Sequence, residues 1–185
     1  ALASFRSLPE VAAADPIAIL PFDAVPDDSL WAAAWWADQP SNHDVNALEA
    51  WQVTSGDSSV VIAILDTGVI PYHPDLAGNL FVNALERGGT PGVDDDGNGA
   101  VDDISGWDFV DLPNNDEVRA GEDWRDQDAA PNDFAGHGTA VAGLAGATTH
   151  NGIGVVSAAW SARILPVRIG WSATGLPLGV ADMLA

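Results

Sequence analysis

His137 and Asp66 are the residues of this sequence whose types and settings best suit proton transfer. His137 stands between two glycines in the stretch GHGT, directly before a run of small apolar residues that predicts a helix. The positive end of a helix dipole disfavours imidazolium, so a histidine placed there is neutral and ready to accept a proton. Taken alone, this histidine also fits a structural role as a cap of the helix.

Asp66 offers the partner that such a base needs. It follows the apolar run VVIAIL in the stretch ILDTG. A carboxylate at a strand end can accept the Nδ1 proton of a histidine, fix its tautomer and stabilise the imidazolium that forms when the other nitrogen is protonated. Aspartic proteases also use DTG, but their chemistry needs two carboxylates that share a proton. This chain has one DTG and no DSG, which argues against that class.

The acidic segment DDDGNGAVDD, residues 94–103, holds a third group of candidates. Counted from Asp94, carboxylates stand at positions 1 and 3, an amide at 5, a glycine at 6 and a carbonyl at 7, as in the first half of an EF-hand calcium loop. Position 12 is Ser105 in place of the usual glutamate, so the closing ligand must come from Asp102, Asp103 or elsewhere. The candidate calcium ligands are Asp94, Asp96, Asn98, the Ala100 carbonyl, Asp102 and Asp103. The alternative is a solvated acidic turn.

The surrounding pattern predicts an α/β domain that positions these groups. The run from Val60 to Leu65 is apolar and rich in β-branched residues, which predicts a strand buried on both faces in a parallel sheet. Open α/β sheets place ligand and catalytic groups at the carboxyl ends of their strands, where Asp66 falls. Residues 137–147 predict a small-residue helix, and SARILPVRI predicts a second buried strand.

The N-terminal part of the chain has a different character. Residues 1–24 mix alanine, proline and isolated apolar residues without a period, which indicates a propeptide remnant or an N-terminal extension. Between Val25 and Trp51 the chain holds four of its eight tryptophans. The spacing of Trp31, Trp35 and Trp36 predicts a helix whose apolar face is used for packing.

Composition narrows the classes of function. The chain has 27 acidic residues against six arginines and no lysine, for a net charge of −21. Such a surface repels nucleic acid and anionic membranes and attracts cations. The absence of cysteine removes disulfides, thiolate chemistry and cysteine-based zinc sites. No apolar run reaches the roughly 18 residues of a membrane span, and the chain starts without methionine or a signal region, which indicates a mature or cut piece.

Two extended stretches, VVIAILDTGVIPYHPDLAGNL and GHGTAVAGLAGATTHNGIGVVSAAWSARILPVRI, resemble the subtilisin-like serine proteases, or subtilases, and DVNALEAW at residues 44–51 fits a flanking motif of that family. The resemblance implies a secreted serine endopeptidase with a three-layer α/β fold and a mostly parallel, doubly wound sheet. It implies that Asp66 is the orienting acid and His137 the general base of an Asp-His-Ser triad. The separation 137 − 66 = 71 is wide, so residues 25–185 are expected to be a peptidase domain with an acidic calcium-loop insertion near 88–133.

Calcium-binding members of that family imply two further sites for structural Ca²⁺. One joins Asp28, Asp75 and Asn151. The other takes Asp108 and Asp111 from the segment WDFVD. The alternative for both is that these residues cap helices and form turns, which Asp and Asn favour.

The sequence motif that carries the nucleophilic serine of subtilases does not occur in this chain. None of the eleven serines lies in a GTSMA-like segment. We therefore expect a domain truncated at its C-terminal side and inactive alone, whose partners are protein or peptide substrates and the remainder of its own catalytic domain. One alternative is a non-catalytic calcium-binding or interaction domain on the same scaffold. Another is a metal-dependent hydrolase that uses the acidic loop, although this loop offers calcium-type oxygens and no histidine.

Overall fold

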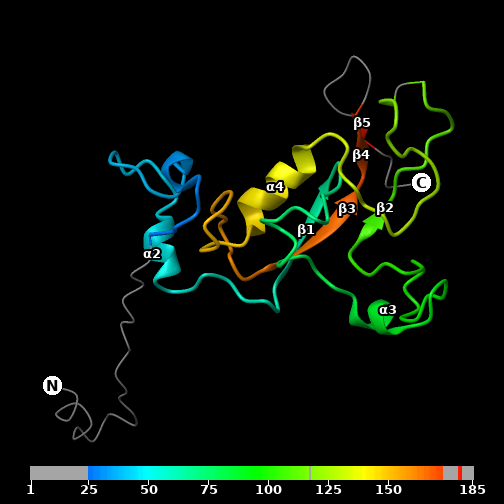
Figure 1. Cartoon of the computed structure of the whole chain (residues 1–185), viewed down its shortest axis with the longest axis horizontal. Helices are drawn as coiled ribbons and strands as arrows, with labels where there is room; N and C mark the ends of the chain where they lie inside the picture. The colour runs from blue at the N-terminus through cyan, green and yellow to red at the C-terminus, as the bar shows by residue number, and fades with distance from the viewer. Residues whose placement is uncertain (1–24, 117, 173–178, 181–185) are drawn as a thin grey trace, which may run out of the picture.

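The computed structural model describes residues 25–116, 118–172 and 179–180, so the prediction for residues 1–24 lies outside the described part. Figure 1 shows a sheet and helix α4 (His137–Gly146) between α2 (Ala47–Trp51) at one end and α3 (Ala84–Gly88) at the other. None of the helices in these ranges is long and apolar enough to cross a membrane. The other elements are the 3₁₀ helix η1 (Trp31–Ala33) and the strands β1 (Val61–Asp66), β2 (Trp107–Asp108), β3 (Arg163–Arg168), β4 (Gly170–Trp171) and β5 (Gly179–Val180).

The central sheet is parallel and has the strand order β1-β3-β2. Its register places Asp66 of β1 and Asp108 of β2 on either side of Arg168 of β3. The strands β4 and β5 form a separate antiparallel pair. The predicted α/β fold with a mostly parallel sheet is confirmed, and Asp66, Asp108 and Arg168 lie at its carboxyl edge.

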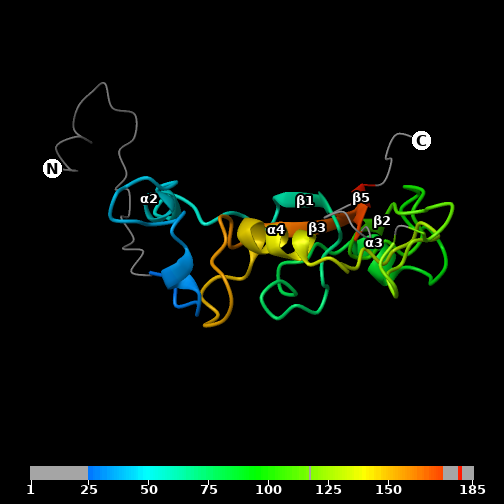
Figure 2. The ribbon, with the colours of Figure 1, turned by 90° about the horizontal axis from the view of Figure 1, so that it is seen from above.

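Helix α4 lies along one face of the sheet, against β1 and β3 (Figure 2). Its small residues permit a close approach, since a Cβ on Gly146 would stand 2.7 Å from Cδ1 of Ile164. Ile64, Ala142 and Ile164 are buried in the core between the helix and the sheet. The helix predicted at 137–147 and the strand predicted in SARILPVRI are both present, and the helix ends at Gly146.

The prediction that residues 60–65 are buried on both faces is wrong for the described part of the chain. Ile64 is buried under α4, whereas its neighbours Val61 and Leu65 are 42% and 48% exposed. Side chains alternate between the two faces of a strand, and the described residues cover one face of β1. The apolar run therefore leaves a hydrophobic surface on the other face.

The predicted tryptophan helix is also wrong. Residues 31–33 form one turn of 3₁₀ helix, and turns follow it. Trp31 and Trp36 both pack on Trp51, with ring centroids 6.4 Å apart in each pair, while Trp35 is 69% exposed. Trp160 packs on Trp51 from another side at 4.6 Å. Convergence on one central ring thus replaces a continuous apolar helix face.

Candidate active site

The side chains of Asp66 and His137 meet at the carboxyl end of β1. Nδ1 of His137 lies 2.8 Å from both carboxylate oxygens of Asp66. Because an ionised carboxylate accepts hydrogen bonds and donates none, we assign the proton to Nδ1, which makes Nε2 the nitrogen that can accept one. The imidazole is 55% exposed and the carboxylate 15%. The arrangement therefore resembles that of a general base whose Nδ1 is hydrogen-bonded to a carboxylate while Nε2 stays free to accept a proton.

Two glycines make this contact possible. Gly136, directly before α4, has φ of +88°, in the left-handed region that favours glycine. Gly138 lies in the first turn, where an added Cβ would stand 2.1 Å from the carbonyl oxygen of Gly68. A larger residue at 138 would push the start of the helix, and His137 with it, away from β1. The close approach explains why the histidine stands between glycines.

A second carboxylate, Asp133, joins the start of α4 to the end of β1. Its Oδ1 accepts hydrogen bonds from the backbone N–H groups of Ala135 and Gly136 and from the hydroxyl of Thr67. Its Oδ2 accepts from both the backbone N–H and the hydroxyl of Thr139. Each oxygen of this carboxylate is thus shared between groups that fix the local backbone.

These contacts lower the pKa of Asp133. Burial raises the pKa of this carboxyl, but the hydrogen bonds from Thr139, Gly136 and Thr67 together outweigh burial. Sequence reasoning missed Asp133, although an aspartate just before a predicted helix start is a capping signal.

The lowered pKa predicts that the stabilising effect of Asp133 is lost in acid. The folded protein binds the proton more weakly than the unfolded chain, so this contribution is complete above the ordinary value of 3.8 and is lost as the pH falls through the folded pKa. We expect the difference in unfolding free energy between wild type and Asp133→Asn to stay constant from about pH 7 to about pH 5 and to shrink below about pH 4. Urea unfolding at each pH measures it. A difference that persists undiminished at about pH 3 contradicts the prediction.

Arg168, on the middle strand, is fully buried and paired with two carboxylates. Its Nη1 donates to Asp108, and its Nη2 donates to the Glu122 carboxylate at 2.9 Å and to the carbonyl of Asp123 at 2.7 Å. The ring of Phe134 lies 5.2 Å from the guanidinium carbon. Because a buried charge without its partner is costly, these contacts hold Asp108 and the chain at 122–123 against β3 beside the candidate site.

Asp108 thus has different neighbours from those expected for a metal pair with Asp111. Its carboxyl is buried, and this burial raises its pKa to about 6. Oxygens of Asp108, Asp123 and Asp128 lie within 4.8 Å of one another, whereas Asp111 is exposed. The structure therefore groups Asp108 with two aspartates that sequence reasoning did not select.

In the acidic loop, residues 94–103, backbone N–H groups donate hydrogen bonds to carboxylates of the same loop. Asp94 accepts hydrogen bonds from the backbone N–H groups of Gly97, Asn98 and Gly99. Asp96 accepts from the backbone and the side-chain amide of Asn98, and the Asn98 amide oxygen accepts from the N–H of Ala100. The first half of the predicted ligand set is thus brought together.

Glu86 enters this loop from α3 and was missed by sequence reasoning. It is 3% exposed, and its carboxylate accepts from the backbone N–H groups of Asp95, Asp96 and Asp102. One oxygen each from Glu86, Asp94 and Asp96 lie within 4.8 Å of one another. Of the remaining predicted ligands, Asp102 accepts from the N–H of Gly92. Asp103 accepts from the side-chain amides of Asn83 and Asn98, which also donate to Asp96.

The loop after α4 contacts both carboxylates of the ligand set predicted at Asp28, Asp75 and Asn151. Asp28 and Asp75 are 4% and 2% exposed. Asp28 Oδ2 accepts from the N–H of His150, while Asp75 accepts from the Asn151 amide and from the N–H of Val155. Within the described part of the chain, Asp28 Oδ1 is buried and has no hydrogen-bond partner. Such an unsatisfied carboxylate oxygen suits a cation.

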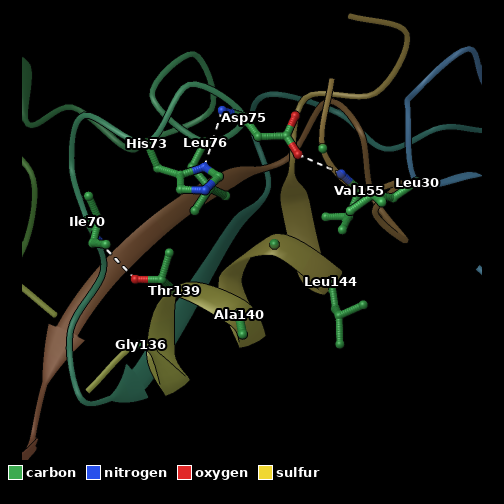
Figure 3. A pocket seen from close by; sticks show the side chains of 12 residues that line it. Leu30, Ile70, His73, Asp75, Leu76, Gly136, Thr139, Ala140, Leu144 and Val155 are labelled. Carbon is green, nitrogen blue, oxygen red and sulfur yellow. Dashed lines mark hydrogen bonds between the residues drawn. The ribbon is translucent and has the colours of Figure 1, made fainter. Parts of the chain in front are cut away.

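An apolar pocket of about 570 Å³ lies along the flank of α4 (Figure 3). Ala140 and Leu144 line it from the helix, and Leu76 and Val155 line it from the neighbouring loops. Gly136, the residue before α4, also belongs to its lining. The small residues of the helix thus leave an open apolar hollow whose lining extends to Gly136, the residue before His137.

Comparison with known proteins agrees with this geometry. The model of the subtilase family matches residues 57–182. Thermitase from Thermoactinomyces vulgaris is 32% identical over 144 residues, which are 78% of this chain and 36% of thermitase. Subtilisin-like protease 1 from Plasmodium berghei (strain Anka) is 37% identical over 112 residues, which are 60% of this chain and 16% of that protein.

Among solved structures, a protease from Pseudoalteromonas arctica PAMC 21717 is similar to this chain with a TM-score of 0.55 and 25% sequence identity. The match covers 86% of this chain and 49% of that one. The chain thus spans well under half the length of the two curated relatives named above.

Proposed function

The chain belongs to the subtilase family, and from this premise we propose that it is part of a serine endopeptidase in which Asp66 and His137 are two members of an Asp-His-Ser triad. The observation that carries the proposal is the 2.8 Å contact between His137 Nδ1 and the Asp66 carboxylate. This contact joins two side chains that are 71 residues apart in the sequence, which supports a role as acid and base of one triad. The exposure of the imidazole agrees with a base that must reach a substrate.

The proposed reaction is the hydrolysis of a peptide bond. Nε2 of His137 takes the proton of the serine hydroxyl as the serine oxygen attacks the peptide carbonyl, and then gives that proton to the departing amine. A water molecule then attacks the acyl group on the serine. Nε2 of His137 takes the proton of this water and gives it to the serine oxygen, which leaves as the hydroxyl and releases the acid product. Asp66 holds the imidazole in the Nδ1–H tautomer and stabilises the imidazolium while it carries two protons.

We propose that the serine comes from sequence beyond residue 185 and that the rest of the peptidase domain packs on this chain. The uncovered face of β1 supports this packing, because Val61 and Leu65 expose hydrophobic surface that a third layer would bury. The open apolar hollow along α4 gives the same support on the opposite face. We also propose that the protein is secreted, and its acidic surface agrees with this proposal.

We propose structural Ca²⁺ at two places. At the first, Asp28, Asp75 and Asn151 would hold the ion, and the buried, unsatisfied Oδ1 of Asp28 is the observation that favours it. A bound ion would there join the N-terminal segment to the loop after α4.

The second proposed Ca²⁺ place is the acidic loop with Asp94, Asp96, Asn98, Ala100, Asp102 and Asp103. The convergence of Asp94 and Asp96 with Glu86 supports it. A site at Asp108 and Asp111 has the least support, because the guanidinium of Arg168 already pairs with Asp108.

A fluorophosphonate probe tests the proposed function on the protein encoded by the complete reading frame. We expect hydrolysis of a labelled protein substrate, and covalent labelling of one serine that replacement of His137 by alanine abolishes. If the protein shows no hydrolysis and no labelling, the result would identify a non-catalytic binding domain. Hydrolysis that resists the probe but stops at once with chelator would identify a metal-dependent hydrolase.

A further inference from the structure

We propose that Asp133 and Thr67 are positioning residues that hold the Asp66 and His137 pair in register. The inference rests on the proposed function for its effect on turnover. Thr67 directly follows Asp66 and is 2% exposed. Its hydroxyl donates to Asp133 Oδ1 at 2.8 Å and accepts from the N–H of Gly138 at 3.0 Å. This one hydroxyl therefore bonds to the residue after His137 and to the carboxylate before α4.

The backbone of Thr67 completes the connection to the acid. Its N–H donates to Asp66 Oδ1 at 2.7 Å, and the same oxygen lies 2.8 Å from His137 Nδ1. A continuous chain of hydrogen bonds thus runs from Asp133 through Thr67 and Asp66 to His137. Movement of Thr67 would change the direction in which the Asp66 carboxylate faces the imidazole.

Asp133 fastens the helix side of the same joint. It accepts from the N–H groups of Gly136 and Thr139, on either side of His137. The hydroxyl of Thr139 donates to Asp133 at 2.6 Å. The same hydroxyl accepts from the N–H of Ile70 at 3.1 Å (Figure 3). The loop after β1 and the first turn of α4 are therefore both anchored on one carboxylate.

The role is one of positioning and not of catalysis. Thr67 is buried, and both its donor and its acceptor are used within the protein. Asp133 uses both oxygens for protein donors. Neither group is placed to touch a substrate, so each acts through the geometry of Asp66 and His137. A displacement of about 1 Å at reacting groups can cost about 100-fold in rate.

Three substitutions in the complete protein separate this role from general stability. Thr67→Val removes the hydroxyl but keeps the side-chain shape and leaves the contacts of Asp133 to α4 in place. Thr67→Ser keeps the hydroxyl. Asp133→Asn replaces one acceptor oxygen by an NH₂ group, which cannot accept the backbone N–H that each oxygen of Asp133 receives. The matched control is Asp57→Asn, since Asp57 also accepts a backbone N–H in a turn but lies before β1, at the far end of the strand.

The first readout does not depend on activity. A proton in the hydrogen bond between His137 Nδ1 and Asp66 gives a low-field ¹H NMR signal, which Asp66→Asn assigns by removing it. We expect Thr67→Val and Asp133→Asn to shift or broaden this signal, and Thr67→Ser and Asp57→Asn to leave it in place. A low-field signal that is the same in Thr67→Val, Asp133→Asn and the control would overturn the inference.

The second readout is kinetic. We expect Thr67→Val and Asp133→Asn each to lower kcat by about 10-fold to 100-fold with KM nearly unchanged, and Thr67→Ser to restore kcat. The double variant should lose less than the product of the two single losses, because both residues act in one network. Values of kcat equal to that of Asp57→Asn would overturn the positioning role. If the wild type hydrolyses nothing but the low-field signal changes in the variants as expected, the proposed function fails and the positioning of the pair stands.

Discussion

Replacing Asp66 by asparagine in the complete protein is expected to lower kcat by about 10⁴-fold while changing KM little. The amide keeps the size of the side chain, but it can present its NH₂ group to Nδ1 and so favour the tautomer in which Nε2 carries the proton. That imidazole cannot accept the serine proton. The loss falls on the transition state, which is why kcat changes and substrate binding does not. Steady-state kinetics on a peptide substrate measures both constants.

Two further variants decide how the Asp66 result is read. His137→Ala should lose at least as much activity, and the double variant should lose no more than His137→Ala alone, because the pair acts as a unit. Asp57→Asn, which also removes one carboxylate charge, should keep full activity. A fall of less than about 10-fold for Asp66→Asn, in a protein that is still folded, would remove this residue from the triad.

The contact between Asp66 and His137 was predictable from sequence because each of the two residues lies in a contiguous local pattern. Asp66 follows an apolar run rich in β-branched residues that predicts a strand, and His137 opens a run of small residues that predicts a helix. Parallel strands place their carboxyl ends at one edge, so the strand pattern also predicted where Asp66 would lie. In the structure Nδ1 of His137 lies 2.8 Å from the Asp66 carboxylate, and the catalytic role of the two residues stays a prediction.

The supporting residues were not predictable in the same way, because their roles depend on contacts between distant segments. Glu86 lies eight residues before Asp94 (94 − 86 = 8), and nothing in its local sequence connects it to the acidic loop. Arg168 reads as an ordinary end of a strand, yet it pairs with Asp108 and Glu122 across the sheet edge. Pattern alone selects ligand types and not the partners that tertiary packing supplies.

The failed predictions have a common physical cause. Apolar periodicity reports that side chains are buried somewhere, without saying against what. The tryptophans predicted as a helix face are packed around Trp51 from separate turns. The strand predicted as buried on both faces has one apolar face open within the described residues. In both cases the hydrophobic content was interpreted correctly and its geometry was set by neighbours far away in the sequence.

Removal of Ca²⁺ is expected to lower the melting temperature of the complete protein by on the order of 10 °C. An ion present at about 1,000 times its dissociation constant stabilises the native state by about 4 kcal/mol, and each kcal/mol shifts Tm by roughly 2–4 °C in a domain of this size. Thermal unfolding with excess calcium and with excess EGTA measures the shift. Mg²⁺ should not restore it, because loops of many carboxylates and carbonyls suit the larger ion.

Substitution at Asp28 connects that shift to one place in the structure. Its carboxylate is buried with one oxygen unsatisfied, so in the absence of calcium the charge has to be accommodated without a partner. Asp28→Asn should therefore lower Tm in calcium, yet leave Tm in EGTA equal to or above that of the wild type. Asp57→Asn should leave both values unchanged. An equal loss of stability for Asp28→Asn in both buffers would mean that the carboxylate serves as a cap for the N–H of His150 and holds no ion.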